Sequence, residues 1–234
     1  NSRWHNYYLE GLDWLAKNTK IDGIYLDDVD FDRDVMKRIR KVLERNRPGA
    51  LVDFHSCNHF SARFGWGSCA NLHLEHFPYM DSLWFGEYFD YGLSPDYWLV
   101  EVSGIPFGLM SEMLQDGGNP WRGMVYGSVT RRSVPTELWK VWDEAGIRSS
   151  RMFGYWSPDA PVQTGRDDVL ATSYVGKDKV LIAVASWAAA PVSCRLDIDW
   201  AKLGMDPAKA TLRGPAIKDF QGEAAFKPGA EIPI

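Results

Sequence analysis

Two carboxylates follow directly on a short apolar run near the start of the sequence. The run is Ile24-Tyr25-Leu26, and the acids are Asp27 and Asp28. Glu87 comes after a second apolar run, residues 82–85. Two facing carboxyl groups can break a glycosidic bond, because one protonates the leaving oxygen while the other attacks the sugar carbon or activates water. We therefore take Asp27, Asp28 and Glu87 as candidate catalytic residues.

The acids in this stretch do not all serve one purpose. Successive residues of a strand point to opposite faces, so one of Asp27 and Asp28 is expected to face the site unless the strand has already ended. Asp30 and Asp32 come just before a helical pattern and suit the cap of its amino terminus. Glu75 is expected on a helix rather than at a strand end, so it ranks below the three candidates.

Side chains suited to binding a sugar follow the other predicted strands. Aromatic rings supply large apolar faces, and His, Asn, Glu and Arg side chains hydrogen-bond to hydroxyl groups. The candidate substrate-binding residues are His55, Asn58, His59, Trp84, Glu112, Trp121, Arg122 and Trp156. His55 and His59 have no strong third ligand nearby, so the sequence predicts no metal site, and no cofactor is expected.

Alternating helices and strands must position these residues. Apolar residues at helical spacing predict helices over residues 4–18, 32–46, 95–102 and 135–146. Short apolar runs predict strands over residues 21–26, 50–54, 82–85, 105–110 and 151–155. This alternation indicates a parallel β/α architecture. In a (β/α)8 barrel the active site lies at the carboxyl ends of the strands, which is where the polar residues gather in this sequence.

The composition changes after Pro161. Residues 168–174, 179–186 and 193–199 alternate as strands do, which predicts a small antiparallel β-sandwich. The predicted fold class is α/β: the C-terminal part of a TIM-type (β/α)8 barrel, with about five β/α units, followed by this sandwich. The predicted domains are a partial barrel catalytic domain at residues 1–160 and the sandwich at residues 161–234.

The number of predicted β/α units leaves the barrel open. The helix at residues 4–18 has no strand before it, so we expect the chain to be part of a longer enzyme with about three further units. An incomplete barrel exposes a strand edge, and self-association through that edge could cover it. A removed leader would favour a periplasmic or secreted location, although the sequence leaves the compartment open.

Composition narrows the class of partner. The net charge of −5 argues against a nucleic-acid binder built on a basic face. No apolar run reaches the roughly 18 residues that a membrane span needs. The 11 Trp residues suit carbohydrate binding, and the three Cys residues form neither a disulfide framework nor a zinc motif. The expected partner is therefore a carbohydrate, with no nucleic acid and no membrane.

Several longer stretches resemble bacterial proteins related to glycoside hydrolase family 123. They are DGIYLDDV, RPGALVDFHSCNHF, PYMDSLWFGEYFDY, SGIPFGLMSEMLQDGGNPWRGMVYG and GYWSPDAPV. More loosely, the layout is similar to barrel α-glycosidases and endo-α-N-acetylgalactosaminidases. The first resemblance implies a β-N-acetylgalactosaminidase in which an adjacent Asp-Glu pair assists attack by the substrate's own acetamido group.

The two resemblances imply different roles for the acids. By the first, Asp27 orients the acetamido group and Asp28 takes the position of the acid, where the family has the longer Glu. By the second, an Asp at this strand is the nucleophile and Glu87 is the acid/base. We prefer the second, with Asp27 as nucleophile or stabiliser and Asp28 as its alternate, because it accounts for Glu87 without a substitution.

The sequence therefore predicts a glycoside hydrolase that acts on a glycan through paired carboxylates. One alternative is a non-catalytic carbohydrate-binding protein, or a degenerate fragment of such an enzyme, which keeps the aromatic residues and lacks turnover. A second alternative is a barrel hydrolase that acts through a metal held at His55 or His59.

Overall fold

A computed structural model describes most of the chain. The described residues are 2–27, 31–55, 69–83, 94–96, 120–127 and 136–234. The chain divides into two compact units, which we describe separately. The first comprises Asn1–Asp90 and Trp98–Met113, and the second comprises Tyr91–Tyr97 and Leu114–Ile234.

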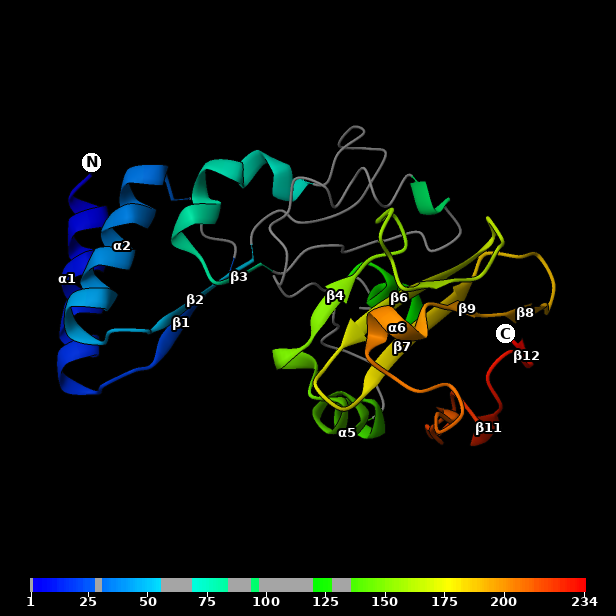
Figure 1. Cartoon of the computed structure of the whole chain (residues 1–234). Coiled ribbons are helices and arrows are strands. Elements are labelled where there is room, and N and C mark those ends of the chain that lie inside the picture. Colours follow the sequence, from blue (N-terminus) through cyan, green and yellow to red (C-terminus); the bar gives the residue numbers. More distant parts are fainter. Residues whose placement is uncertain (1, 28–30, 56–68, 84–93, 97–119, 128–135) are drawn as a thin grey trace. The chain divides into compact units, whose positions relative to one another are not determined.

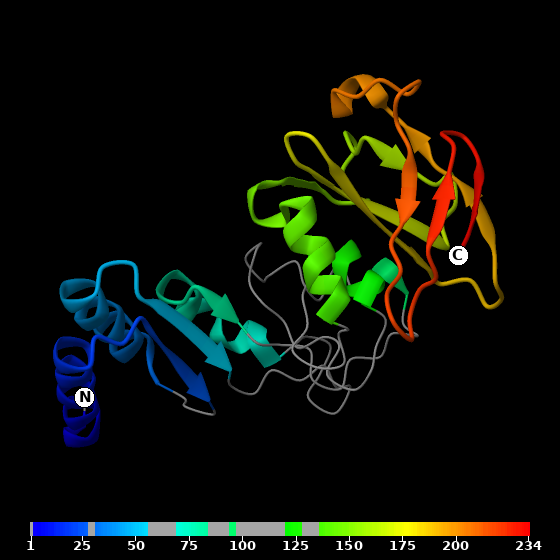
Figure 2. The same ribbon diagram turned by 90° about the horizontal axis from the view of Figure 1, so that it is seen from below.

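The first unit contains a parallel sheet with helices on one side of it (Figure 1). Its elements are α1 (Arg3–Asn18), β1 (Gly23–Asp27), α2 (Arg33–Asn46), β2 (Leu51–His55), the 3-10 helix η2 (Cys69–Tyr79) and β3 (Ser82–Leu83). The strand order is β1-β2-β3, and all three strands run in the same direction (Figure 2). The predicted parallel β/α arrangement is confirmed for these strands.

The helices of this unit form where capping and apolar spacing agree. Asp32 caps α2, because its side chain accepts a hydrogen bond of 2.8 Å from the backbone N–H of Val35. Asp32 was predicted to cap this helix, and the prediction is confirmed. The apolar face of α2 is fully buried, and so is the face of α1 that carries Leu9, Leu12 and Ala16.

Asp13 joins α1 to α2. Its carboxylate accepts hydrogen bonds from Lys17 on its own helix and from Arg45 and Asn46 on α2, at 2.5, 2.6 and 2.7 Å. These donors hold the pKa of the Asp13 carboxyl well below its usual range, because they stabilise the charged form. The helices that support the sheet are therefore linked by one ionised group.

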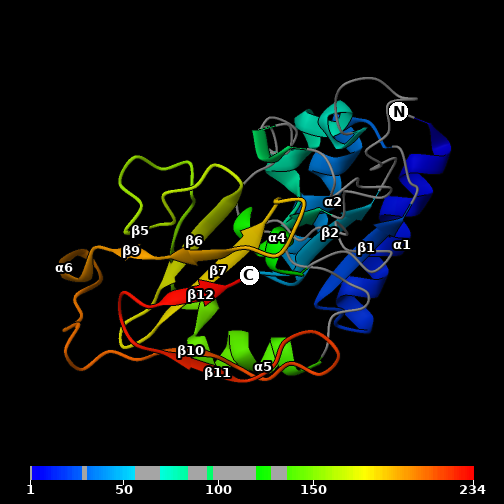
Figure 3. The same cartoon turned by 90° about the vertical axis from the view of Figure 1, so that its right-hand side faces the viewer.

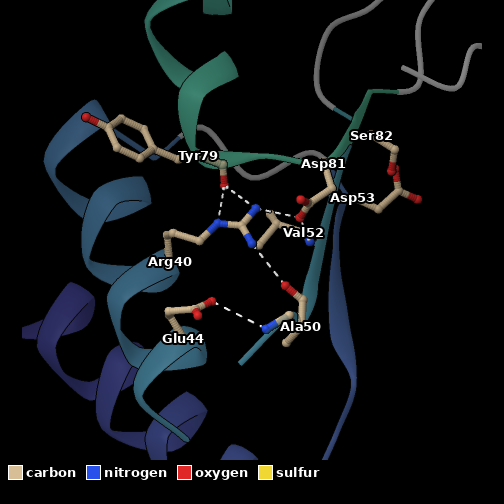
Figure 4. A network of polar contacts seen from close by, with 9 residues as sticks. Arg40, Glu44, Ala50, Val52, Asp53, Tyr79, Asp81 and Ser82 are labelled. Carbon is tan, nitrogen blue, oxygen red and sulfur yellow. Dashed lines mark hydrogen bonds and ion pairs between the residues drawn. The ribbon is translucent and has the colours of Figure 1, made fainter. Parts of the chain in front are cut away.

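Arg40 of α2 fixes the starts of β2 and β3 (Figure 4). Its guanidinium donates to the backbone carbonyls of Ala50 and Tyr79 and to the Asp81 carboxylate, the last at 2.5 Å. The same carboxylate oxygen of Asp81 accepts from the backbone N–H of Val52 at 2.7 Å. The guanidinium of Arg40 thus fixes the positions at which β2 and β3 begin relative to each other.

The second unit contains short antiparallel sheets and small helices (Figure 3). Its helices are α4 (Pro120–Val125), α5 (Thr136–Ala145), η3 (Ile147–Ser149) and α6 (Trp200–Leu203). Its strands are β4 (Arg151–Phe153), β5 (Val162–Gln163), β6 (Val169–Val175), β7 (Val180–Ser186), β8 (Ser193–Arg195), β9 (Asp197–Ile198), β10 (Leu212–Gly214), β11 (Ala224–Phe226) and β12 (Glu231–Pro233). The sheets are β4-β6-β7, β5-β9, β12-β8 and β10-β11, all antiparallel.

Two apolar clusters form the core of this unit. One gathers Val169, Leu196 and Leu203 with their neighbours, and the other gathers Met124, Leu138 and their neighbours beneath β6 and β7. The predicted helix at residues 135–146 is confirmed as α5. Gly146 ends it in the left-handed conformation, with φ of 69°.

The prediction that residues 151–155 form a parallel strand of the barrel is wrong. The segment does form a strand, β4, but it pairs antiparallel with β6, with Arg151 opposite Val175 and Phe153 opposite Ser173. The seven-residue strand β6 is long enough to pair with every residue of β4. Met152 of β4 packs on the apolar core under α5. The predicted barrel domain at residues 1–160 therefore included a strand that belongs to the antiparallel sheet.

Other predictions fall outside the part of the chain that the structure describes. These are the strand at residues 105–110 and nearly all of the helix at residues 95–102. Among the described helices, none combines the length and apolar character needed to cross a membrane.

Gly23 provides a test of how closely β1 and β2 must approach. A Cβ atom at this position would lie 2.6 Å from the backbone carbonyl oxygen of Leu51, whereas one at Gly11 of α1 would meet nothing within 4 Å. We expect Gly23→Ala to lower the free energy of unfolding by about 1–3 kcal/mol, because the strands must shift. The control Gly11→Ala should raise it by about 0.4–1 kcal/mol. Urea unfolding measures both, and equal stabilisation by the two substitutions would contradict the close approach.

Asp13 provides a pH-dependent test of the link between α1 and α2. Because its pKa is lower in the folded state, its stabilising effect is complete above the unfolded pKa of about 4 and is lost as the pH falls further. We expect Asp13→Asn to lower the melting temperature at pH 7, and the gap to the native chain to narrow below about pH 4. Calorimetry across this range measures the gap. A gap that does not change with pH would show that the charge of Asp13 is irrelevant.

Candidate functional site

Polar side chains share one face of the parallel sheet at its carboxyl end. Residues two apart in a strand lie on the same face, so Tyr25 shares a face with Asp27, and Asp53 shares one with His55. The parallel register places Tyr25 beside Asp53 and Asp27 beside His55. The intervening residue of β1, Leu26, is only 2% exposed and lies on the opposite face, in the core.

Asp27, His55 and Tyr25 form a connected group at the end of β1 and β2. Nδ1 of His55 lies 3.1 Å from Oδ1 of Asp27 and 2.8 Å from the phenol oxygen of Tyr25. The His55 and Tyr25 rings are stacked, with an interplanar angle of 23°. The His55 side chain is 12% exposed, whereas that of Asp27 is 58% exposed. The imidazole is therefore held in place while the carboxylate faces outward.

The charge on Asp27 decides where the proton of His55 sits. A neutral imidazole nitrogen is either a donor or an acceptor, so Nδ1 cannot accept from Tyr25 and donate to Asp27 at once. An ionised carboxylate only accepts, and a bare Nδ1 lone pair facing it at 3.1 Å would be repelled. An ionised Asp27 therefore requires the proton on Nδ1.

A second polar contact continues across the sheet from β2 to β3. The hydroxyl of Ser82 donates to Oδ1 of Asp53 at 2.5 Å (Figure 4). Asp53 lies two residues before His55, and its neighbour across β1 is Tyr25. The polar face thus extends over all three parallel strands.

The structure brings together some of the predicted site residues and leaves others undescribed. Asp27 and His55 are in contact at the carboxyl ends of their strands. Six of the predicted residues lie outside the described residues, namely Asp28, Asn58, His59, Trp84, Glu87 and Glu112. The backbone of Trp121 lies in α4 of the second unit.

Arg122, predicted to bind substrate, lies in α4 and bonds to the neighbouring sheet. Nε and Nη2 of its guanidinium both donate to the carbonyl oxygen of Ser186 at the end of β7, at 3.0 and 2.5 Å. The guanidinium also lies over the Trp187 ring, 4.8 Å from its centroid. In this position Arg122 holds α4 against β7.

Trp156, also predicted to bind substrate, belongs to an aromatic cluster of the second unit. Its ring lies parallel to that of Tyr126, at an interplanar angle of 10°, and meets Tyr155 edge-on at 5.2 Å between centroids. Both phenols donate to the carbonyl oxygen of Pro95, and burial raises the pKa of each. Trp156 remains 42% exposed, so the cluster presents an indole to solvent.

No metal-binding group was found among the described residues. In that part of the chain, no three His, Cys, Asp or Glu side chains gather closely enough to hold an ion. Cys194 is buried and forms no disulfide.

Sequence reasoning missed three members of the polar face, namely Tyr25, Asp53 and Ser82. The spacing of two between Tyr25 and Asp27, and again between Asp53 and His55, was a usable signal for a shared face. For Ser82 the sequence carried no such signal, because its contact with Asp53 depends on the register of β2 with β3.

Two family models together match the whole chain. "Glycoside hydrolase 123, TIM-barrel domain" matches residues 1–133, and "Glycoside hydrolase 123, C-terminal domain" matches residues 134–234. Among solved structures, the fold is similar to that of a noncanonic maltogenic alpha-amylase, AmyB from Thermotoga neapolitana, with a TM-score of 0.58 at 10% sequence identity. That match covers 100% of this chain but 64% of the amylase chain. A search of curated proteins found no match.

The position of Arg122 predicts its effect on stability. We expect Arg122→Met to lower the free energy of unfolding by about 1.5–3 kcal/mol, because it removes the charged donor to Ser186. Arg122→Lys should recover part of the loss, since an ammonium can donate to Ser186 but lacks the planar pair of N–H groups and the flat face that lies over Trp187. Denaturant unfolding measures both variants. Native stability in Arg122→Met would contradict the described contact.

Proposed function

The chain belongs to glycoside hydrolase family 123, and on that premise we propose that it hydrolyses a glycan that contains an N-acetylhexosamine. Asp27 is the nucleophile or stabiliser, Glu87 is the acid/base, and Asp28 is the alternate for either role. The observation that carries this proposal is the position of Asp27. Its carboxylate is 58% exposed and lies at the carboxyl end of a parallel strand, which is where TIM-barrel enzymes place their catalytic groups.

The proposed reaction needs two groups that act on opposite sides of the bond. The acid gives its proton to the glycosidic oxygen, which leaves with the electron pair of the bond to C1. The carboxylate of Asp27 either forms a new bond to C1 or holds the acetamido N–H while the acetamido oxygen forms that bond. The oxygen of a water molecule then bonds to C1 as the bond to the carboxylate or acetamido oxygen breaks. The proton that this water loses returns to the acid residue.

The carboxylate of Asp27 has one described side-chain contact. Nδ1 of His55 lies 3.1 Å from Oδ1, where a protonated Nδ1 can donate to an ionised carboxylate. Oδ1 is the only oxygen of Asp27 with a partner in the described ranges, and the side chain as a whole is 58% exposed. An exposed carboxylate with one oxygen that is not engaged by the described residues suits contact with C1 or with an acetamido group.

The other predicted residues complete the proposal as substrate contacts. Asn58 and His59 follow β2 in the sequence and Trp84 follows β3. Glu112 also belongs to the first unit, and Trp121, Arg122 and Trp156 belong to the second unit. The half-exposed indole of Trp156 supplies an apolar surface that matches the C–H face of a sugar ring. Arg122 also supports the position of α4 through its hydrogen bond to Ser186.

We propose the finer architecture on the same basis. The strands β1–β3 belong to a TIM-type barrel, which the parallel pairing and the description of the family model support. The antiparallel sheets of the second unit form a small β-sandwich, supported by the apolar cluster that β6, β8 and β9 share.

Substitution of the three acids tests the proposed function. The experiment compares Asp27→Asn, Asp28→Asn and Glu87→Gln with the native chain, using aryl glycosides with and without a 2-acetamido group. Asp27→Asn should reduce kcat/KM by at least about a thousandfold, because it removes the reacting charge. Glu87→Gln should reduce it most for substrates with poor leaving groups, which need protonation.

The same panel separates the two mappings of the acids. Preference for substrates with the acetamido group, together with loss of activity in Asp28→Asn, would assign the acid to Asp28. Loss in Glu87→Gln with Asp28→Asn active supports the assignment made above. Full activity in all three variants would overturn the proposal, as would glycan binding without turnover by the native chain.

A further inference from the structure

The two oxygens of Asp27 have different environments. Oδ1 lies 3.1 Å from Nδ1 of His55, and no other partner of the carboxylate is present in the described part of the chain. The imidazole is 12% exposed and stacked on Tyr25, whose phenol oxygen lies 2.8 Å from Nδ1. The carboxylate is thus anchored through one oxygen to a ring that cannot easily turn, while it remains 58% exposed.

This anchor has a defined direction. Asp27 and His55 are paired residues of adjacent parallel strands, so the two side chains start from neighbouring backbone positions. The contact joins β2 to β1 across the sheet and uses only Oδ1 of the carboxylate. A rotation of the Asp27 side chain about its Cα–Cβ bond would break the contact with His55.

We propose that His55 is a positioning residue, which holds Asp27 in one rotamer with Oδ2 toward the substrate, and that Tyr25 holds His55. This inference rests on the proposed function, because it assigns His55 a role toward Asp27 rather than toward a sugar hydroxyl. The proton on Nδ1 is the essential element, since an ionised carboxylate accepts only from a protonated nitrogen. Tyr25 restricts the imidazole ring through stacking, and its phenol oxygen, 2.8 Å from Nδ1, can accept a share of the same N–H.

Conservative substitutions distinguish positioning from substrate binding. The amide N–H of Asn takes the place of Nδ1–H, whereas the longer Gln places its amide near the position of Nε2. We expect His55→Gln to lower kcat by about 10- to 100-fold with little change in KM, because Asp27 loses its orientation. His55→Asn should restore most of kcat. Tyr25→Phe should lower kcat less than His55→Gln, since stacking remains.

Each alternative role for His55 gives another pattern. A sugar-binding His55 would raise KM in both substitutions, and a merely structural one would lower the melting temperature without rescue by Asn. Either pattern would overturn the proposal. If Asp27→Asn is itself fully active, the role assigned to Asp27 fails and the positioning role of His55 fails with it, whereas the proposed function fails only if all three acid variants are fully active. If Asp27→Asn is inactive while His55→Gln is normal, only the positioning role fails.

A spectroscopic measurement tests the same contact without turnover. Proton–nitrogen correlation spectra of the imidazoles show which ring nitrogen carries the proton, and the chain has only five His residues to assign. We expect Nδ1 of His55 to be protonated at neutral pH. The spectrum of Asp27→Asn should show a different tautomer balance, because the carboxylate that holds the proton is gone. A bare Nδ1 in the native chain, or identical spectra for the two proteins, would contradict the proposal.

Discussion

The pairing of β1 with β2 is the constraint on which the candidate site depends. In this register Asp27 lies beside His55 and Tyr25 beside Asp53, so four chemically capable side chains meet on one face of the sheet. The alternate residues, including Leu26, face the core, and their burial determines which face of the sheet carries the polar residues. A shift of the pairing by one residue would separate Asp27 from His55 and turn the polar residues toward the core.

The register is held from outside the site. Gly23 allows the backbones to approach closely where the pairing begins, and Arg40 ties α2 to the starts of β2 and β3 through Ala50 and Asp81. These contacts involve backbone carbonyls and a carboxylate that itself binds the backbone of Val52. The exposed side chain of Asp27 is therefore positioned by contacts in which the acid itself takes no part, so its carboxylate is available for chemistry.

Local features of this fold could be predicted from the sequence, whereas partners across strands could not. The cap at Asp32, the strand that ends at Asp27 and the helix stop at Gly146 each depend on residues close in the chain. The strand at Arg151 was predicted, but its pairing was not, because an apolar pattern does not show whether a strand runs parallel to an earlier one or antiparallel to β6. The contacts of His55 with Asp27, and of Ser82 with Asp53, likewise arise from register.

The account centres on one carboxylate oxygen, so the most direct measurement is where a bound sugar lies relative to it. A crystal structure of the chain with a non-hydrolysable thioglycoside of an N-acetylhexosamine supplies this distance. We predict that Oδ2 of Asp27 lies within about 3.5 Å of the anomeric carbon or of the acetamido nitrogen, with Oδ1 still bound to His55. A sugar bound elsewhere, with Asp27 facing solvent, would contradict the account.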